Sequence, residues 1–229
     1  GFNQAFRSLA PESVAGLVPG TKFETAGLGF DQSFASGTWI GVEAEWLTSD
    51  GTRSIGVLTN SFFIPFADSP GQTSETLSFT ERALSAYAGQ LLGDNFSVGA
   101  RYRVSEADLK PSFPDIPTTA LNLDTFQQRR RATLQELSLT ANFHHRCGAF
   151  AQWESAWWRQ DNSSDPTVAA DENFWQHNFI AGYRFPRRQA EIRLGLLNIF
   201  DADYRLNPLN LHADLPRGRT FTASVRLNF

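Results

Sequence analysis

Apolar and polar residues alternate one by one along most of this chain. In residues 221–229 every odd position is apolar and every even position is polar. The same alternation recurs in residues 96–105, 40–46 and 136–143, whereas helical spacing of apolar residues is hard to find. Because successive side chains of a β-strand point to opposite faces, this period of two predicts strands with one apolar and one polar face.

The alternation predicts an all-β fold of about nine strands. Their expected ranges are 22–34, 38–48, 77–92, 95–107, 130–145, 149–160, 173–185, 189–200 and 219–229. Short turns with Gly, Asp or Pro chemistry join some of them, at 35–37, 93–94, 146–148 and 186–188. Long polar or Pro-rich connections join the others, at 49–76, 108–129, 161–172 and 201–218. Short and long connections therefore alternate strictly along the chain.

This alternation of connections favours an outer-membrane barrel. Such barrels have tight turns at one end and long loops at the other, whereas a soluble β-sandwich has no reason to collect its long loops at one end. Most predicted strands have about ten residues or more, enough for a tilted strand to cross a bilayer. Aromatic residues fall mostly toward strand ends, as girdle residues do: Trp39, Trp46, Tyr102, Trp153, Trp157, Tyr183 and Phe185. We expect an antiparallel transmembrane β-barrel, closed so that every backbone group is paired.

The polar face of the predicted strands is rich in charge, which bears on the width of the barrel. Its ionisable residues are Glu43, Glu45, Arg101, Arg103, Glu136, Glu154, Arg184 and Arg226. The interior of a barrel of about eight strands is filled by side chains, so these charges would need close pairing at a cost in desolvation. A wide, water-filled or plugged interior accepts them easily. Bacterial single-chain barrels also have an even number of strands, which predicts that the nine belong to a larger barrel.

Composition excludes several other classes of protein. The 229 residues include 13% aromatic and 19% charged residues, which argues against a disordered polyelectrolyte. The net charge of -4 argues against nucleic-acid binding, and a single cysteine can form neither an internal disulfide nor a structural zinc site. No apolar run approaches the ~18 residues of a membrane-spanning helix. The chain contains no methionine, so we expect a processed mature protein or a fragment.

Four short segments and the last residue resemble elements of the TonB-dependent outer-membrane receptors. Residues 194–204 (LGLLNIFDADY) resemble the N-[LI]-F-D-x-x-Y element before the last extracellular loop, and residues 216–221 (PRGRTF) resemble the entry to the final strand, with Arg217 inserted. Phe229 matches the terminal aromatic residue of the family. Residues 5–12 (AFRSLAPE) and 17–24 (LVPGTKFE) resemble two segments near the middle of its barrel. The order and spacing of these segments match across the whole chain.

The resemblance implies a receptor whose barrel has twenty-two strands. Residues 1–229 would form its C-terminal portion, with the plug domain and the TonB box absent from this chain. The implied function is TonB-dependent, energised uptake of an iron-siderophore, haem, cobalamin or a saccharide through the outer membrane of a Gram-negative bacterium. The implied partners are outer-membrane lipid and lipopolysaccharide, the barrel-assembly machinery and, through the absent part, the TonB complex. The expected assembly signal consists of Phe221, Val225, Leu227 and Phe229.

Two other functions stay open from the sequence. One is a complete small outer-membrane barrel that acts as an adhesin or a structural protein; the other is a soluble β-sandwich binding module. We expect neither an enzyme nor a cofactor or metal site, because no G-x-S-x-G element occurs and no Ser-His-acid set is marked out by spacing. The adjacent His144 and His145 would point to opposite faces and could not chelate one metal together. The ligand-binding residues stay undefined.

Three local features are candidates for contact with other molecules. Glu43 and Glu45 share one face of a strand, and we expect them to be wetted residues paired with arginines. The run 129–131 of three arginines could bind an anionic ligand or lipopolysaccharide phosphates, or could simply be a solvated strand shoulder. The aromatic cluster in residues 60–66 could form a contact surface or tuck into the barrel mouth.

Overall fold

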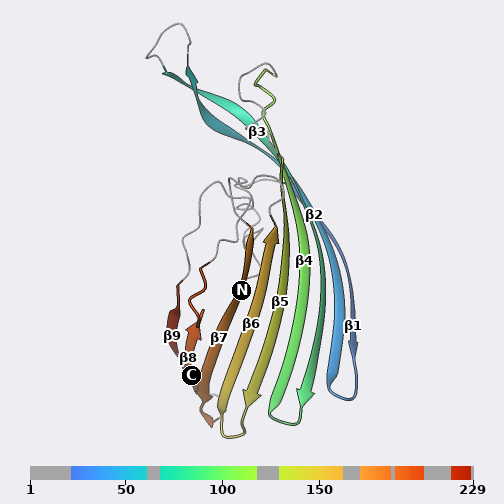
Figure 1. Ribbon diagram of the computed structural model, residues 1–229, viewed down its shortest axis with the longest axis vertical. Helices are drawn as coiled ribbons and strands as arrows, with labels where there is room; N and C mark the ends of the chain where they lie inside the picture. The colour runs from blue at the N-terminus through green and yellow to red at the C-terminus, as the bar shows by residue number, and fades with distance from the viewer. Residues whose placement is uncertain are drawn as a thin grey trace.

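The predicted strands are present in the computed structural model as a single antiparallel sheet of nine strands (Figure 1). The structure describes residues 22–60, 68–117, 129–161, 171–186, 189–203 and 218–227, without the side chains of 58–60 and 68–70. The strands are β1 (Lys22–Ser33), β2 (Thr38–Asn60), β3 (Asp68–Leu92), β4 (Phe96–Ser112), β5 (Arg130–His144), β6 (Ala149–Asp161), β7 (Glu172–Arg184), β8 (Ala190–Leu197) and β9 (Thr220–Leu227). The all-β, antiparallel prediction is confirmed.

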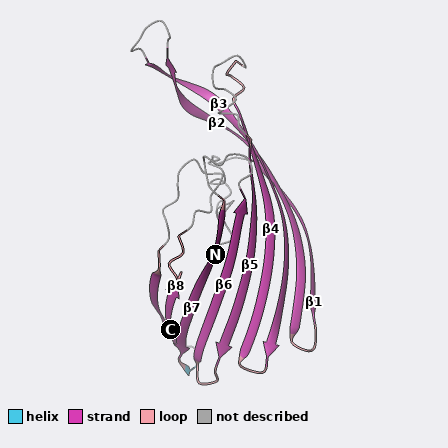
Figure 2. Ribbon diagram, viewed as in Figure 1, coloured by secondary structure: helices cyan, strands magenta, loops and turns pink. Residues whose placement is uncertain are grey.

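The sheet follows the order of the chain. Each strand pairs with the one before and the one after it, which leaves β1 and β9 at the two edges. The sheet is curved, and strands are the main regular element of the described chain (Figure 2). Within the described residues no helix is long and apolar enough to cross a membrane.

The predicted short turns lie at one end of the sheet, which we call the turn end. Three of them contain a glycine in the left-handed region of backbone conformation, namely Gly37 (φ 75°), Gly93 (φ 63°) and Gly148 (φ 102°). Residues with a side chain adopt this conformation only at a cost, so glycine permits a tight connection there. We call the opposite end, from which the long connections leave, the loop end.

The predicted connection 49–76 is wrong over most of its length. β2 continues to Asn60 and β3 begins at Asp68, so the two strands form a ribbon that extends beyond the other strands (Figure 1). Ser and Thr residues made this segment look like a loop, but Thr is a good strand former, and Thr52 and Thr76 pair across the ribbon with a hydrogen bond of 3.2 Å. β4 likewise extends to Ser112, into the predicted connection 108–129, because the longer β3 gives it a partner.

One face of the sheet, the outer face, carries a band of exposed apolar side chains. On β4 this band consists of Phe96, Val98, Ala100, Tyr102 and Val104. Toward the loop end the same face becomes polar, with Glu106, Asp108 and Lys110. The change occurs on the neighbouring strands too, after Trp46 on β2, after Leu84 on β3 and after Trp157 on β6. The band is therefore continuous across the sheet, with a polar border toward the loop end.

The opposite face, the inner face, is polar only in part. Toward the loop end it carries a buried apolar cluster that reaches from β2 to β6, with partly buried residues of β1 and β7 packed against it. Its buried members are Leu47, Leu77, Phe79, Ala107, Leu109, Ala132, Leu134 and Trp158. The prediction of a uniformly polar interior face is therefore incomplete. The predicted charged residues Glu43, Arg101 and Arg103 lie closer to the turn end than this cluster.

Candidate functional site: a charged row on the inner face

Backbone register brings the charged residues of the inner face together. Glu43 on β2 pairs with Ser85 on β3, which pairs with Arg103 on β4, which in turn pairs with Glu136 on β5. Residues that are direct partners in adjacent strands point to the same face of a sheet. The four side chains therefore form one transverse row, although they are far apart in the sequence.

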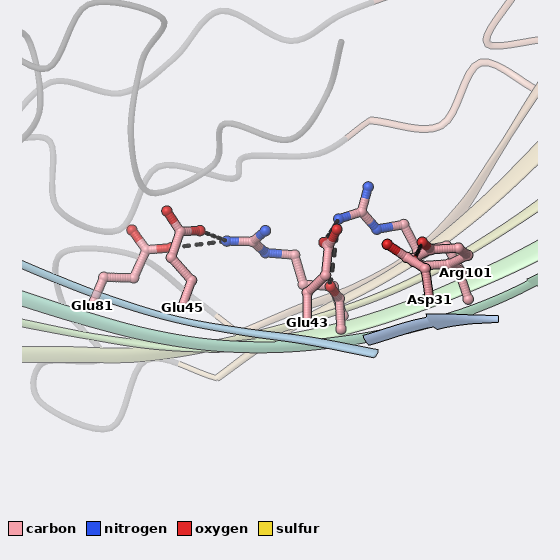
Figure 3. Close-up of polar contacts among 8 residues, drawn as sticks. Asp31, Glu43, Glu45, Glu81 and Arg101 are labelled. Carbon is pink, nitrogen blue, oxygen red and sulfur yellow. Dashed lines mark hydrogen bonds and ion pairs between the residues drawn. The ribbon is translucent and has the colours of Figure 1, made fainter. Parts of the chain in front are cut away.

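Arg101 links two strands within this region. Its Nη2 atom lies 3.3 Å from Glu43 Oε2 and 3.5 Å from Ser85 Oγ, and the Ser85 hydroxyl donates a hydrogen bond of 3.3 Å to the same Glu43 oxygen. Arg101 and Ser85 thus share the carboxylate of Glu43, and Figure 3 shows the contact between Arg101 and Glu43. Glu43 was predicted to pair with an arginine, and it does, but the arginine comes from β4 and reaches over β3.

Arg103 and Glu81 form the most buried ion pair among the described residues of the inner face. The Nη2 atom of Arg103 lies 3.3 Å from Glu81 Oε1 and 3.7 Å from Glu45 Oε2. The Glu81 side chain is only 5% exposed and that of Arg103 17% exposed, so water screens this pair much less than the pair of Arg101 with Glu43. One guanidinium therefore neutralises carboxylates from two different strands, β2 and β3.

Tyr87 carries the polar contacts of the inner face to the edge strand β1, in the register line next to this row. Its hydroxyl donates a hydrogen bond to the carboxylate of Asp31. The residue between them in the register is Gly41 of β2, and a β-carbon at that position would collide with both Tyr87 and Asp31. A glycine at position 41 is therefore what allows the tyrosine to cross one strand and reach the next.

A second polar group on the inner face spans β6 and β7. Gln152 Nε2 donates to Glu154 Oε1 over 2.7 Å, and Asn178 Nδ2 donates to Glu154 Oε2 over 3.3 Å. Asn178 in turn accepts a hydrogen bond of 2.9 Å from the backbone N–H of Asn198, at the end of β8. The polar side chains of this group thus satisfy one another, as most polar groups removed from bulk water do.

The inner face offers a fixed lining of paired charges and amides rather than a reactive centre. The guanidiniums are held by carboxylates, and the buried Nε of Arg101 has no hydrogen-bond acceptor. Within the described ranges no group of three or more His, Cys, Asp or Glu residues is arranged to hold a metal ion. Such a surface can contact and orient a polar or charged solute without changing it covalently.

The proposed assembly residues fall on one side of the last strand. Phe221, Val225 and Leu227 on β9 are 69%, 66% and 58% exposed and lie on the outer face with the apolar band. Phe229 lies outside the described residues. Among the expected girdle residues, Trp39 is misplaced, because its ring packs against Gly89 on the inner face.

The arginines of the run 129–131 do not all lie on one face of the sheet. Arg129 and Arg131 both bond to Asp108 on the outer face, whereas Arg130 is placed on the inner face by the alternation of β5. His144 ends β5, and the ring of His145 in the following turn contacts Cys147 Sγ at 3.0 Å. Residues 61–66 of the aromatic cluster lie outside the described residues.

Sequence reasoning missed one polar pair on the outer face. The Ser155 hydroxyl lies 2.7 Å from His177 Nδ1 and accepts a hydrogen bond of 2.9 Å from Trp153 Nε1. Trp175 stacks on the imidazole at 5.9 Å between ring centroids, and Phe200 meets it edge-on at 5.1 Å. The break in alternation at His177 was the available signal. Serine and histidine satisfy each other there beneath aromatic rings, which keeps the apolar face free of open polar groups.

No protein-family model matches the chain, and no curated protein matches it. Among solved structures, one described as the NanC porin aligns with a TM-score of 0.38 and 12% sequence identity. The alignment covers 91% of this chain and 97% of that chain. A similarity at this level carries no conclusion about fold or function.

Proposed function

We propose that this chain forms part of the wall of an outer-membrane β-barrel that takes up a small polar or charged ligand. The observation that carries the proposal is the apolar band of the outer face, opposite an inner face with paired charges. A sheet with an exposed apolar face and a charged opposite face fits lipid on one side and an aqueous or plugged interior on the other.

The height of the band agrees with a bilayer. From Phe96 to Val104 the outer face of β4 is apolar, a span of eight residue steps or about 26 Å of strand. At a tilt of about 40° such a strand covers roughly 20 Å of depth, close to the apolar belt of outer-membrane barrels. Trp46, Tyr102, Trp157 and Trp175 lie at or near its loop-end border, where aromatic girdles are found.

The direction of the edge strands bears on how the barrel closes. Eight successive antiparallel pairings separate β1 from β9, so the two edge strands run in the same direction. A barrel closed by antiparallel pairing alone therefore needs an odd number of strands in addition to these nine. The twenty-two strands expected from the resemblance to TonB-dependent receptors satisfy this condition, and so do ten.

The finer proposal is a TonB-dependent receptor in which this chain supplies the C-terminal part of the wall. Support comes from the receptor-like segments of the sequence and from the charged row, which a wide or plugged interior accepts more easily than a narrow one. A small self-contained barrel is the second candidate. The buried apolar cluster of the inner face favours it, because narrow barrels are filled by side chains.

Cysteine scanning tests the membrane topology directly. Cys147 is the single cysteine of the chain and is exposed in a turn, so a Cys147→Ser background leaves each introduced thiol alone. We expect an environment-sensitive fluorophore to be quenched by brominated lipid at Val42 and Val98 but not at the adjacent Glu43 and Ser97. Equal quenching at neighbouring positions, or recovery of the native protein in the soluble fraction, would sink the proposal.

The TonB-dependent receptor and the small self-contained barrel can be separated by conductance. The full-length protein is inserted into planar lipid bilayers between KCl solutions, and the current is recorded. A plugged, energised receptor should give no steady current. A persistent current through the untreated protein would contradict TonB-dependent uptake and leave a passive channel. If no current flows and the native protein has the same mass as this chain, both TonB-dependent uptake and a passive channel are contradicted. That outcome would favour a small complete barrel that acts as an adhesin.

A further inference from the structure

A charged pocket lies on the outer face just beyond the apolar band, on the loop side of β3, β4 and β5. Its volume is about 370 Å³. The lining residues alternate along the three strands and their flanks: Ser78, Thr80, Arg82, Glu106, Asp108, Lys110, Arg129 and Arg131. Four cationic side chains face two carboxylates, so the pocket carries a net positive charge in a protein whose net charge is -4.

Asp108 organises the arginine side of the pocket. Arg129 Nε lies 2.7 Å and 2.9 Å from its two carboxylate oxygens, and Arg131 Nε lies 3.3 Å from Oδ2. The Asp108 side chain is 19% exposed, whereas those of Arg129 and Arg131 are 43% and 46% exposed. The partly buried carboxylate therefore holds two guanidiniums side by side, with a large part of each open to solvent. Two adjacent guanidinium forks match the geometry of a phosphate group.

Arg82 and Lys110 supply the remaining positive charge. Arg82 pairs with Glu106 in the β3–β4 register and Lys110 pairs with Ser78, yet neither cation forms an ion pair or hydrogen bond within the described part of the chain. The hydroxyls of Thr80, next to Arg82 on the same face of β3, and of Ser78, opposite Lys110, also line the pocket and can donate to an anion. The pocket thus combines two positioned guanidiniums, two further cations and two hydroxyls.

We propose that this pocket binds a phosphate group on the headgroup of an anionic lipid in the outer leaflet. The proposal rests on the proposed function, which places the apolar band in the membrane and the long connections outside the cell. A pocket directly beyond the band on the outer face then lies at the depth of the lipid headgroups. Positive clusters at that depth attract anionic lipid, and phosphate suits the arginines that Asp108 positions.

The test measures lipid binding to the full-length protein in a zwitterionic detergent. The probes are bisphosphorylated lipid A and its dephosphorylated form, each carrying a fluorophore, together with inorganic phosphate as competitor. We expect the double variant Arg82→Gln, Lys110→Gln to bind the phosphorylated lipid roughly tenfold more weakly or worse, because both substitutions remove charge-assisted contacts. The unaltered protein should bind the dephosphorylated lipid with a similarly reduced affinity.

Arg130→Gln is the control on the opposite face, because it removes a positive charge close to the pocket in sequence but on the inner face of the sheet. Its affinity for phosphorylated lipid A should equal that of the unaltered protein. Equal affinity of the double variant, or equal binding of dephosphorylated lipid, would overturn the site. Micromolar binding of inorganic phosphate without preference for the lipid would overturn the assignment to a headgroup.

The cysteine scan keeps this outcome separate from the proposed function. Lipid quenching at Val42 and Val98 reports the membrane band whether or not the pocket binds phosphate. If Val42 and Val98 are quenched but the double variant binds phosphorylated lipid A as tightly as the unaltered protein, the pocket alone is rejected. A lack of quenching would reject the membrane barrel, and the headgroup proposal with it.

Discussion

Arg103 forms ion pairs with two carboxylates at once, since its Nη2 atom lies 3.3 Å from Glu81 and 3.7 Å from Glu45. Both carboxylates come from strands other than that of the arginine, so the side chain ties β4 to β3 and β2 across the inner face. Glu81 is the most buried of the three.

Replacement of Arg103 by methionine should destabilise the protein by about 3 kcal/mol, because the substitution leaves a buried carboxylate without its cation. The free energy of unfolding is measured by urea titration of the protein in lipid vesicles. Arg101→Met is the matched control: the side chains of its pair with Glu43 are 39% and 50% exposed, and we expect a loss of about 1 kcal/mol or less. Equal losses in both variants would contradict the difference in burial.

A lysine on the outer face should be far more harmful than one on the inner face. Val98 is 39% exposed within the apolar band, whereas the adjacent Ser97 faces inward. We expect Val98→Lys to reduce the free energy of unfolding in lipid by about 2 kcal/mol or more, and Ser97→Lys to have a much smaller effect. Unfolding in vesicles checks both variants. A larger loss for Ser97→Lys would reverse the assignment of the two faces.

Phe229 should be needed for assembly into outer membranes. Phe221, Val225 and Leu227 expose one apolar face of β9, and the alternation of the sequence predicts the same side for Phe229. We expect Phe229→Ser to reduce sharply the amount of protein in washed outer membranes, as measured by quantitative immunoblotting. Asn228→Ser, on the polar side, should leave the amount unchanged. Normal yield of Phe229→Ser would remove this residue from the assembly signal.

The carboxyl of Asp108 should titrate at unusually low pH. Hydrogen bonds from Arg129 hold the pKa of Asp108 below its usual value of 3.8. Because the pKa is lowered in the folded state, the stability from this pair is fully present above the unfolded pKa and is lost as the pH falls through the folded one. We expect Arg129→Gln to raise the pKa of Asp108, which carboxyl-detected NMR can measure. An unchanged midpoint, as expected for the control Arg130→Gln, would argue against the pair.

The strands could be predicted from the sequence because alternation is a local property of the chain. Residues 96–105 show the pattern in full, and the turns at Gly37, Gly93 and Gly148 bear the residues that such turns require. The length of β2 and β3 could not be predicted, because Ser and Thr residues suit a loop and a solvated ribbon equally well. Pairing with the opposite strand decides between these, and pairing is not local.

The candidate site was only half predictable. The charges of Glu43, Arg101 and Arg103 were visible on the polar face, and pairing with arginine was expected. The sequence held no signal that Arg103 reaches Glu81 or that Tyr87 crosses Gly41, because both contacts depend on register between distant segments. The pocket around Asp108 depends on register too, since three strands contribute to it.

The ribbon formed by the loop-end parts of β2 and β3 extends beyond the other strands of the sheet (Figure 1). Arg53 and Glu75 hold the two strands together with an ion pair of 2.6 Å, well beyond the end of the apolar band. On the proposed orientation this ribbon projects from the membrane into the external medium, where molecules outside the cell reach it before the other described strands. A substitution in the ribbon should leave the contacts of the charged row intact, because the row lies many residues away along the same two strands.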